Sequence, residues 1–356
     1  MGNSRAHLDL TPTCPIATVP PLIVSPVQIQ SRPMLHSGVA TVRKLAWVLT
    51  GFLLGASFAA AQPICTLEGH EAGITSIAFR PGTRQLATAG RDRNIKIWDS
   101  ATGARLHLLP GHDAAITAIA FSPDGNALAS TDADGHVFLW RPNQSEVPQS
   151  LEGHPSCALG AAFSPDGTLL FTCGHDHRVR AWSVPARELA FSIGPLASQP
   201  CCLALSSDGA RVAIGGTDGE IVICSTPARR IVNSLPTHGA AVRSVAFSPN
   251  GKHLVSGADD ASVCIWDLGA GHEFVRLEGH REQFTQVRYS PSGRRLATAD
   301  ASGLVIVWEA AGGQPLFSHR FPGCVHAIAF APDGASLAVG TNATRLFLIE
   351  LPLKAR

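Results

Sequence analysis

The pattern of apolar and polar residues repeats along most of the chain with a period of about 42 residues. The residue that ends each alternating run recurs at intervals of 42, 42, 42, 42, 42 and 41, at Phe79, Phe121, Phe163, Leu205, Phe247, Tyr289 and Phe330. Nineteen residues after each comes a second series, Trp98, Trp140, Trp182, Cys224, Trp266, Trp308 and Ile349. Five of the protein's six tryptophans share this phase, so the chain contains one unit seven times.

Each unit predicts four short strands and no helix. An alternating run such as 74–79 leads into a turn such as Ser122–Gly125, where proline presets φ and glycine takes the left-handed conformation. The other three strands are typified by residues 128–131, 94–98 and 105–109. Four strands in about 42 residues are typical of one propeller blade, so the sequence predicts an all-β, seven-bladed β-propeller.

The units resemble those of the WD-repeat (tryptophan–aspartate repeat) family. The resemblance covers residues 64 to about 351 and rests on Leu67-Glu68-Gly69-His70 with Trp98-Asp99, Leu277-Glu278-Gly279-His280 with Trp308-Glu309, and Thr237-His238 with Trp266-Asp267. It implies that the strand at 64–67 completes the last blade, so that N- and C-terminal strands pair and close the ring. Residues 62–356 then form one propeller domain.

Four units carry His, Ser or Thr, Asp and Trp in the same order: His70, Thr88, Asp92 and Trp98; His112, Ser130, Asp134 and Trp140; His154, Thr172, Asp176 and Trp182; His238, Ser256, Asp260 and Trp266. The sets look like hydrolase triads, but a catalytic set is needed once, and none lies in a Gly-x-Ser-x-Gly turn. The resemblance implies instead a buried hydrogen-bond network that pins a loop to a strand. We therefore expect no catalytic residue and no cofactor.

Three units depart from this set. The sixth keeps His280, Thr298 and Trp308 but has Ser302 in place of the aspartate. The fourth keeps only Asp218 and has Leu196, Ile214 and Cys224 elsewhere, and the seventh has Phe321, Val339, Ala343 and Ile349. Because a polar network can be replaced as a whole by apolar groups at little cost, we expect the fourth and seventh blades to rely on apolar packing.

Other chemically active residues give weaker signals. His175-Asp176-His177 and Asp259-Asp260 contain aspartates that the networks already use, so we expect no metal site there. Eight cysteines occupy positions that other units fill with small residues, which favours core packing over a disulfide framework, although sequence alone does not give their pairing: Cys65, Cys157, Cys173, Cys201, Cys202, Cys224, Cys264 and Cys324.

Composition and charge exclude two classes of protein. With 45% hydrophobic residues the chain has enough apolar material for a large core, which argues against disorder. The formal net charge is +1, so no basic excess is available for phosphate contacts, and a nucleic-acid partner is not expected.

The first 61 residues do not share the repeat. Residues 1–33 hold six prolines and are interpreted as a Pro-rich extension, which is not translated if the chain starts at Met34. Residues 34–61 combine Arg43 and Lys44 with the uncharged stretch Leu45–Ala61, which ends in small residues and predicts a signal peptide cleaved before Gln62. The mature protein would then be periplasmic or extracellular and free of the membrane. An uncleaved membrane tether and a cytoplasmic protein are the alternatives.

The resemblance places partner binding on the top face, at the Gly-His loops, the first residues of each inner strand and the turns before the network aspartates. The polar or charged residues at these positions are Arg91, His175, Arg243, Asp259 and His326. No tryptophan or tyrosine accompanies them, which predicts modest affinity or a peptide-like ligand. The expected function is a monomeric, non-catalytic scaffold for a protein or peptide. The alternative is a small-ligand-binding or enzymatic propeller that uses its central channel.

Overall fold

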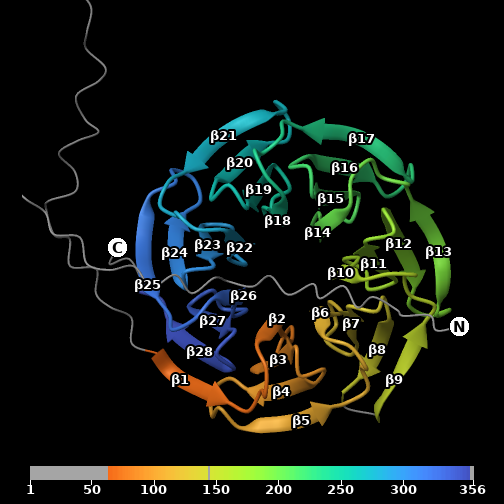
Figure 1. Cartoon of the computed structure of the whole chain (residues 1–356), viewed down its shortest axis with the longest axis vertical. Helices are drawn as coiled ribbons and strands as arrows, with labels where there is room; N and C mark the ends of the chain where they lie inside the picture. The colour runs from red at the N-terminus through yellow and green to blue at the C-terminus, as the bar shows by residue number, and fades with distance from the viewer. Residues whose placement is uncertain (1–62, 143–144, 353–356) are drawn as a thin grey trace, which may run out of the picture. The chain divides into compact units, whose positions relative to one another are not determined.

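The described residues of the computed structural model, 63–142 and 145–352, form seven four-stranded antiparallel sheets in a ring (Figure 1). No helix occurs among them, and the predicted all-β, seven-bladed propeller is confirmed. The strands are β1 Pro63–Glu68, β2 Ile74–Phe79, β3 Gln85–Gly90, β4 Ile95–Asp99, β5 Arg105–Leu109, β6 Ile116–Phe121, β7 Leu128–Asp132, β8 Val137–Arg141, β9 Ser145–Leu151, β10 Ala158–Phe163, β11 Leu169–Gly174, β12 Arg178–Ser183, β13 Glu188–Ile193, β14 Pro200–Leu205, β15 Arg211–Gly216, β16 Ile221–Ser225, β17 Arg230–Leu235, β18 Val242–Phe247, β19 His253–Ala258, β20 Val263–Asp267, β21 His272–Leu277, β22 Phe284–Tyr289, β23 Arg295–Asp300, β24 Leu304–Glu309, β25 Pro315–Arg320, β26 Val325–Phe330, β27 Ser336–Thr341 and β28 Arg345–Glu350.

The ring closes through the two ends of the described chain. Blades 1 to 6 each take four consecutive strands, from β2–β5 to β22–β25, with the first strand innermost. Blade 7 has the order β26-β27-β28-β1, so its outermost strand comes from the other end of the sequence. The predicted closure is therefore confirmed, and Leu67 of β1 lies opposite Leu346 of β28.

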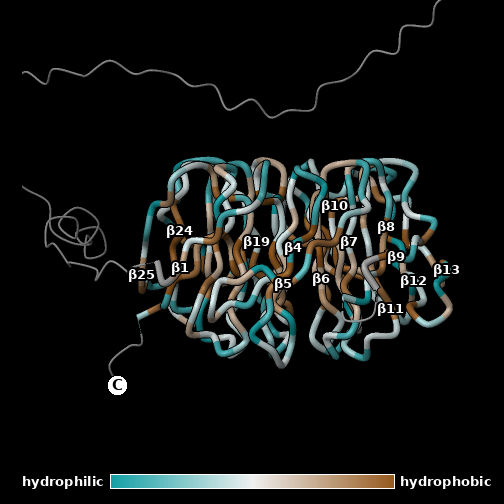
Figure 2. The backbone as a smooth tube through the Cα atoms, turned by 90° about the horizontal axis from the view of Figure 1, so that it is seen from below, coloured by the Kyte–Doolittle hydropathy of each residue, from teal (hydrophilic) through white to brown (hydrophobic). Residues whose placement is uncertain are grey.

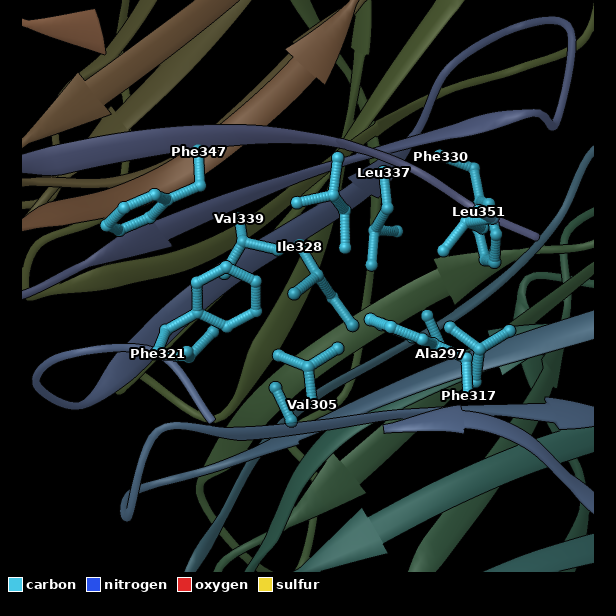
Figure 3. Packing of buried hydrophobic residues seen from close by; sticks show 14 residues of the cluster. Ala297, Val305, Phe317, Phe321, Ile328, Phe330, Leu337, Val339, Phe347 and Leu351 are labelled. Carbon is cyan, nitrogen blue, oxygen red and sulfur yellow. The ribbon is translucent and has the colours of Figure 1, made fainter. Parts of the chain in front are cut away.

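The core lies between the blades. Between blades 6 and 7, Ala297, Val305 and Phe317 face Ile328 and Val339 in one cluster of buried side chains (Figure 3). The apolar segments follow the strands, while the loops at the two ends of the ring are more hydrophilic (Figure 2). Each blade therefore buries an apolar face against each of its neighbours.

All seven inner strands share one backbone irregularity. The register of each shifts between its first and third residues, which makes the second residue a bulge. A bulge twists the strand and re-aims its side chain. The seven bulge residues all line one cavity in the centre of the ring: Thr75, Thr117, Leu159, Cys201, Arg243, Thr285 and His326.

Side chains of the inner strands connect neighbouring blades. The Thr75 hydroxyl donates to the carbonyl oxygen of Ile116 at 2.6 Å. Ser76 Oγ accepts a hydrogen bond from the Ile119 amide at 3.1 Å. Because inner strands of adjacent blades belong to separate sheets, these bonds satisfy backbone groups that no ladder reaches.

The ring has a top face and a bottom face. The top face carries the loops that lead into the inner strands and the turns between the second and third strands of each blade. These segments touch, as where the Arg91 amide donates to the Gly73 carbonyl oxygen at 2.9 Å. The bottom face carries the turns that leave the inner strands.

The N-terminal predictions concern residues that are not described. The Pro-rich extension at 1–33 and the signal peptide at 34–61 both lie outside the described residues. Within 63–142 and 145–352, no helix is long and apolar enough to span a membrane. The eight cysteines of this region all have free thiols.

Ring closure can be tested with two leucines on outer strands. Leu67 of β1 is 5% exposed, whereas Leu106 of β5 is 41% exposed. We expect Leu67→Ala to lower the free energy of unfolding by about 2–5 kcal/mol, because it leaves a cavity beneath the closing strand. Leu106→Ala should change it by less than about 0.5 kcal/mol. Urea titration measures both, and equal effects would contradict a closing role for β1.

Candidate functional site at the top face and central channel

A chain of hydrogen bonds links the top-face loop of blade 1 to its strands. Trp98 Nε1 donates to Thr88 Oγ1 at 2.8 Å, and His70 Nε2 lies 2.7 Å from the same hydroxyl. His70 Nδ1 lies 2.8 Å from Asp92 Oδ2. Because the carboxylate needs a donor, Nδ1 carries the proton, and Nε2 accepts from the hydroxyl. Asp92 also receives a bond from Lys96 Nζ at 3.0 Å.

Blade 3 repeats this geometry, and blade 5 modifies it. His154 lies 2.8 Å from the Thr172 hydroxyl and 2.9 Å from Asp176. In blade 5, His238 Nδ1 lies 2.7 Å from Ser262 Oγ but 3.9 Å from Asp260. Ser262 in turn donates to Asp260 at 2.5 Å, so the hydroxyl relays the link between histidine and carboxylate.

The prediction that Asp134 is the network aspartate of blade 2 is wrong. His112 Nδ1 lies 2.7 Å from Asp132 Oδ2, two residues earlier at the end of β7, and Asp134 is exposed. The rest of the set is as expected, since His112 and Trp140 both bond Ser130, at 2.6 and 2.7 Å. Asp132 is fully buried and also bonds the amide of His136 at 2.8 Å.

Blade 6 likewise has a complete set, contrary to the prediction that Ser302 replaces its aspartate. His280 Nδ1 lies 2.7 Å from Asp300 Oδ2, at the end of β23. Ser302 donates to the other oxygen of Asp300 at 2.5 Å and so supports the carboxylate. Thr298 lies 2.7 Å from His280 and from Trp308, as in the other sets.

A side chain at the strand-end position would crowd an aspartate on the turn. Gly90 occupies in blade 1 the strand position that Asp132 occupies in blade 2. A Cβ atom at Gly90 would lie 3.0 Å from Asp92 Oδ1 and 3.1 Å from His70 Nδ1. A turn aspartate therefore needs a small residue at the strand end. An aspartate at the end of the second strand is therefore the sequence signal for the arrangement of blades 2 and 6, in which that aspartate bonds the histidine.

Blades 4 and 7 replace the network by apolar contacts, as expected. In blade 4, Leu196, Ile214 and Cys224 are buried in one cluster. In blade 7, Phe321 and Val339 pack in the cluster between blades 6 and 7 (Figure 3). Among the described residues of blades 4 and 7, this exchange leaves no buried side-chain polar atom without a partner, which explains why it is tolerated.

The His–hydroxyl–Asp arrangement resembles the triad of a serine hydrolase, but its hydroxyl is not accessible to a substrate. The five hydroxyl residues are fully buried, and a tryptophan N–H covers each hydroxyl: Thr88, Ser130, Thr172, Ser256 and Thr298. A nucleophile must reach its substrate, so these five sets instead tie each top-face loop to the strands of its own blade. Burial raises the pKa of Asp132, but bonds from His112 and from the His136 amide outweigh it and lower the pKa below 3.8.

Two of the predicted binding residues meet at the mouth of the channel. Arg243 is the bulge residue of blade 5, and Asp259 lies on the turn of the same blade. Arg243 Nε and Nη2 donate to the two oxygens of Asp259 at 2.8 and 2.5 Å. The Arg243 side chain is 48% exposed. This fork-to-fork pair fixes one acidic and one basic group at a solvent-facing position.

The other three candidates lie elsewhere around the ring. His326 is the bulge residue of blade 7. Its pKa falls to about 4 because of burial and the nearby positive charge of Arg91, so its ring is neutral at pH 7. Arg91 is exposed on the turn of blade 1. His175 lies on the turn of blade 3, where its amide donates to the Cys157 carbonyl oxygen at 2.9 Å. Among the described residues its side chain is paired neither with Arg243 and Asp259 nor with His326 and Arg91.

A seven-bladed ring with His–Ser/Thr–Asp links in five blades defines a WD-type propeller. The profile described as "WD domain, G-beta repeat" matches residues 61–99, 103–141, 145–183, 229–267 and 271–309, which is more than half of the chain. The chain therefore belongs to the WD40 family. The five matched stretches correspond to blades 1, 2, 3, 5 and 6, the blades that carry the network.

One curated relative shares a short segment. Over 40 residues the chain is 45% identical to nuclear distribution protein nudF 1 of Talaromyces marneffei. The match covers 11% of this chain and 9% of that protein. A segment of this length is about one blade, so the similarity carries no function of the whole relative.

The aspartate of blade 2 can be tested with two neighbouring substitutions. We expect Asp132→Ala to lower the free energy of unfolding by about 2–4 kcal/mol, because it leaves His112 Nδ1 buried without an acceptor. Asp134→Ala, on the exposed turn, should change it by less than about 0.5 kcal/mol. Thermal unfolding of both variants beside wild type decides the assignment. A larger loss from Asp134→Ala would restore the original assignment.

Proposed function

We propose that this protein is a non-catalytic scaffold that binds a protein or peptide partner on the top face of its ring. The observation that carries this proposal is that histidines of the top-face loops bond to buried hydroxyls of the blades. Five blades anchor their top-face loops to buried hydroxyls, so that face is a rigid, pre-organised surface. WD40 propellers generally bind protein partners, which supports the same conclusion.

The composition of the face defines the kind of partner. The Arg243–Asp259 pair offers both donors and acceptors at the channel mouth, and Arg91 adds an exposed positive charge. None of the seven bulge residues is a tryptophan or tyrosine. Large aromatic anchors dominate tight interfaces, so a polar peptide bound with modest affinity suits this face best.

Two charge-matched triple variants test the face. The first replaces Arg91, Arg243 and Asp259 by alanine. The second, a control on the bottom face, replaces Arg84, Lys252 and Asp333, which are exposed and remove the same charges. We expect the first to weaken partner binding at least tenfold, which is about 1.4 kcal/mol, and the second to leave it unchanged.

The measurement is cross-linking of each tagged chain to its partners in the native host, quantified against wild type. Both variants must first show the wild-type melting temperature, so that a loss reflects the surface and not the fold. Partners that stay with the top-face variant at the wild-type level would overturn the proposed binding face.

We further propose that the propeller is exported after removal of residues 34–61. The support is the basic pair Arg43-Lys44 followed by the uncharged stretch Leu45–Ala61. N-terminal sequencing of the protein from each cell fraction of its host tests this. A chain that begins at Gln62 in the extracytoplasmic fraction is expected. A chain that retains Leu45–Ala61, in the membrane or the cytosol, would overturn export.

A further inference from the structure

One inner-strand position separates blade 6 from all the others. The fifth residue of the inner strand is alanine in six blades, at Ala78, Ala120, Ala162, Ala204, Ala246 and Ala329. In blade 6 it is Arg288 on β22. An arginine among alanines brings a long cation to a position where the fold itself requires only a small side chain.

The Arg288 guanidinium is only partly satisfied by the protein. Nη1 donates to the Val287 carbonyl oxygen at 2.8 Å and to Ser244 Oγ at 3.2 Å. Nε and Nη2 make no hydrogen bond with the described residues, and Arg288 forms no ion pair among them. Three of the five N–H donors of the guanidinium are therefore available.

Arg288 lines the central cavity, whose volume is about 240 Å³. The other charged side chain of the lining, Arg243, is neutralised by Asp259. His326 is neutral at pH 7, and burial raises the pKa of the Cys202 thiol to about 12, so it is not a counter-ion. The cavity thus holds one uncompensated positive charge in a polar lining, where burial makes such a charge unfavourable.

A second unsatisfied group lines the same cavity. The hydroxyls of Thr75 and Thr117, bulge residues of blades 1 and 2, donate to carbonyl oxygens of the next blade at 2.6 and 2.5 Å. The equivalent hydroxyl of Thr285 in blade 6 is buried and has no hydrogen-bond partner within the described residues. Buried polar atoms without a partner are rare, so the Thr285 hydroxyl is the second polar group beside this cavity that the protein leaves unsatisfied.

We propose that the central channel binds a carboxylate group, with Arg288 as its cationic partner and Thr285 as a further donor. The Nε–Nη2 edge of a guanidinium matches the two oxygens of a carboxylate. A carboxylate carries one negative charge and compensates the single excess positive charge, whereas a phosphate near −2 would leave a negative charge unpaired. The carboxylate belongs either to a small organic acid or to the C-terminus of a peptide.

The first experiment replaces chloride by acetate at constant ionic strength and follows the melting temperature of the whole protein, with acetamide as the uncharged counterpart. A ligand that binds only the folded state raises this temperature. We expect acetate to raise it in a saturable way and acetamide to have no effect. Equal responses to the two would overturn the proposal without any variant.

The second experiment repeats the acetate series with three variants. Arg288→Ala restores the residue of the other six blades, so it should fold, and it should lose the acetate response. Thr285→Val should raise the apparent Kd for acetate severalfold. Arg294→Ala removes an exposed arginine of the same blade and should respond as wild type does. A full acetate response in Arg288→Ala would overturn the proposal.

A comparison of triglycine with its C-terminal amide distinguishes the two sources of the carboxylate. Tighter binding of triglycine than of acetate, lost on amidation, would support a peptide terminus as the natural ligand. Equal binding of triglycine and acetate would support a small acid. If neither triglycine nor acetate binds more tightly than its amide, the channel does not recognise carboxylates. These outcomes do not depend on the top-face partner.

Discussion

Each blade of this propeller has two apolar faces, and all of these faces are covered only when the ring closes. The buried clusters draw residues from adjacent blades, as between blades 6 and 7, where Phe317 packs near Ile328 and Val339 (Figure 3). Closure depends on β1, which supplies the outermost strand of blade 7 from the opposite end of the described chain. Removal of any blade would expose two faces at once, so the ring is a single cooperative unit although its sequence is modular.

Within that ring, four arrangements tie the top-face loop to the blade. A histidine bonds an aspartate on the turn (Asp92), an aspartate at the end of the second strand (Asp132), or a serine that relays the link to a turn aspartate (Ser262). In the fourth arrangement an apolar cluster replaces the whole set, as at Leu196. The first two place a carboxylate oxygen within hydrogen-bond distance of Nδ1 from different backbone positions. Every buried polar group of a blade needs a hydrogen-bond partner. The position in the sequence from which the carboxylate comes matters less.

The centre of the ring is freer to vary than the blades. A backbone bulge presents one residue per blade to the channel, and these residues range from Thr75 to Leu159 and Arg243. Their contacts differ: the Thr75 hydroxyl bonds the next blade, Leu159 packs against the cluster between blades 3 and 4, and Arg243 pairs with Asp259. Arg288 also varies from its counterparts, because the other six blades have alanine at this position of the inner strand. We therefore expect the binding properties of this propeller to depend on differences among otherwise equivalent positions.

The sequence by itself determined the architecture, because a 42-residue period with Trp98 and its counterparts in one phase admits one arrangement of strands. It also determined the histidine, hydroxyl and tryptophan of each network. It did not determine the aspartates of blades 2 and 6, since Asp132 and Asp134 are both acidic and two residues apart, and only the strand end directs one of them at His112. The pairing of Arg243 with Asp259 and the partly unsatisfied guanidinium of Arg288 were decided by tertiary structure, because they depend on where bulges and neighbouring blades place side chains that are distant along the chain.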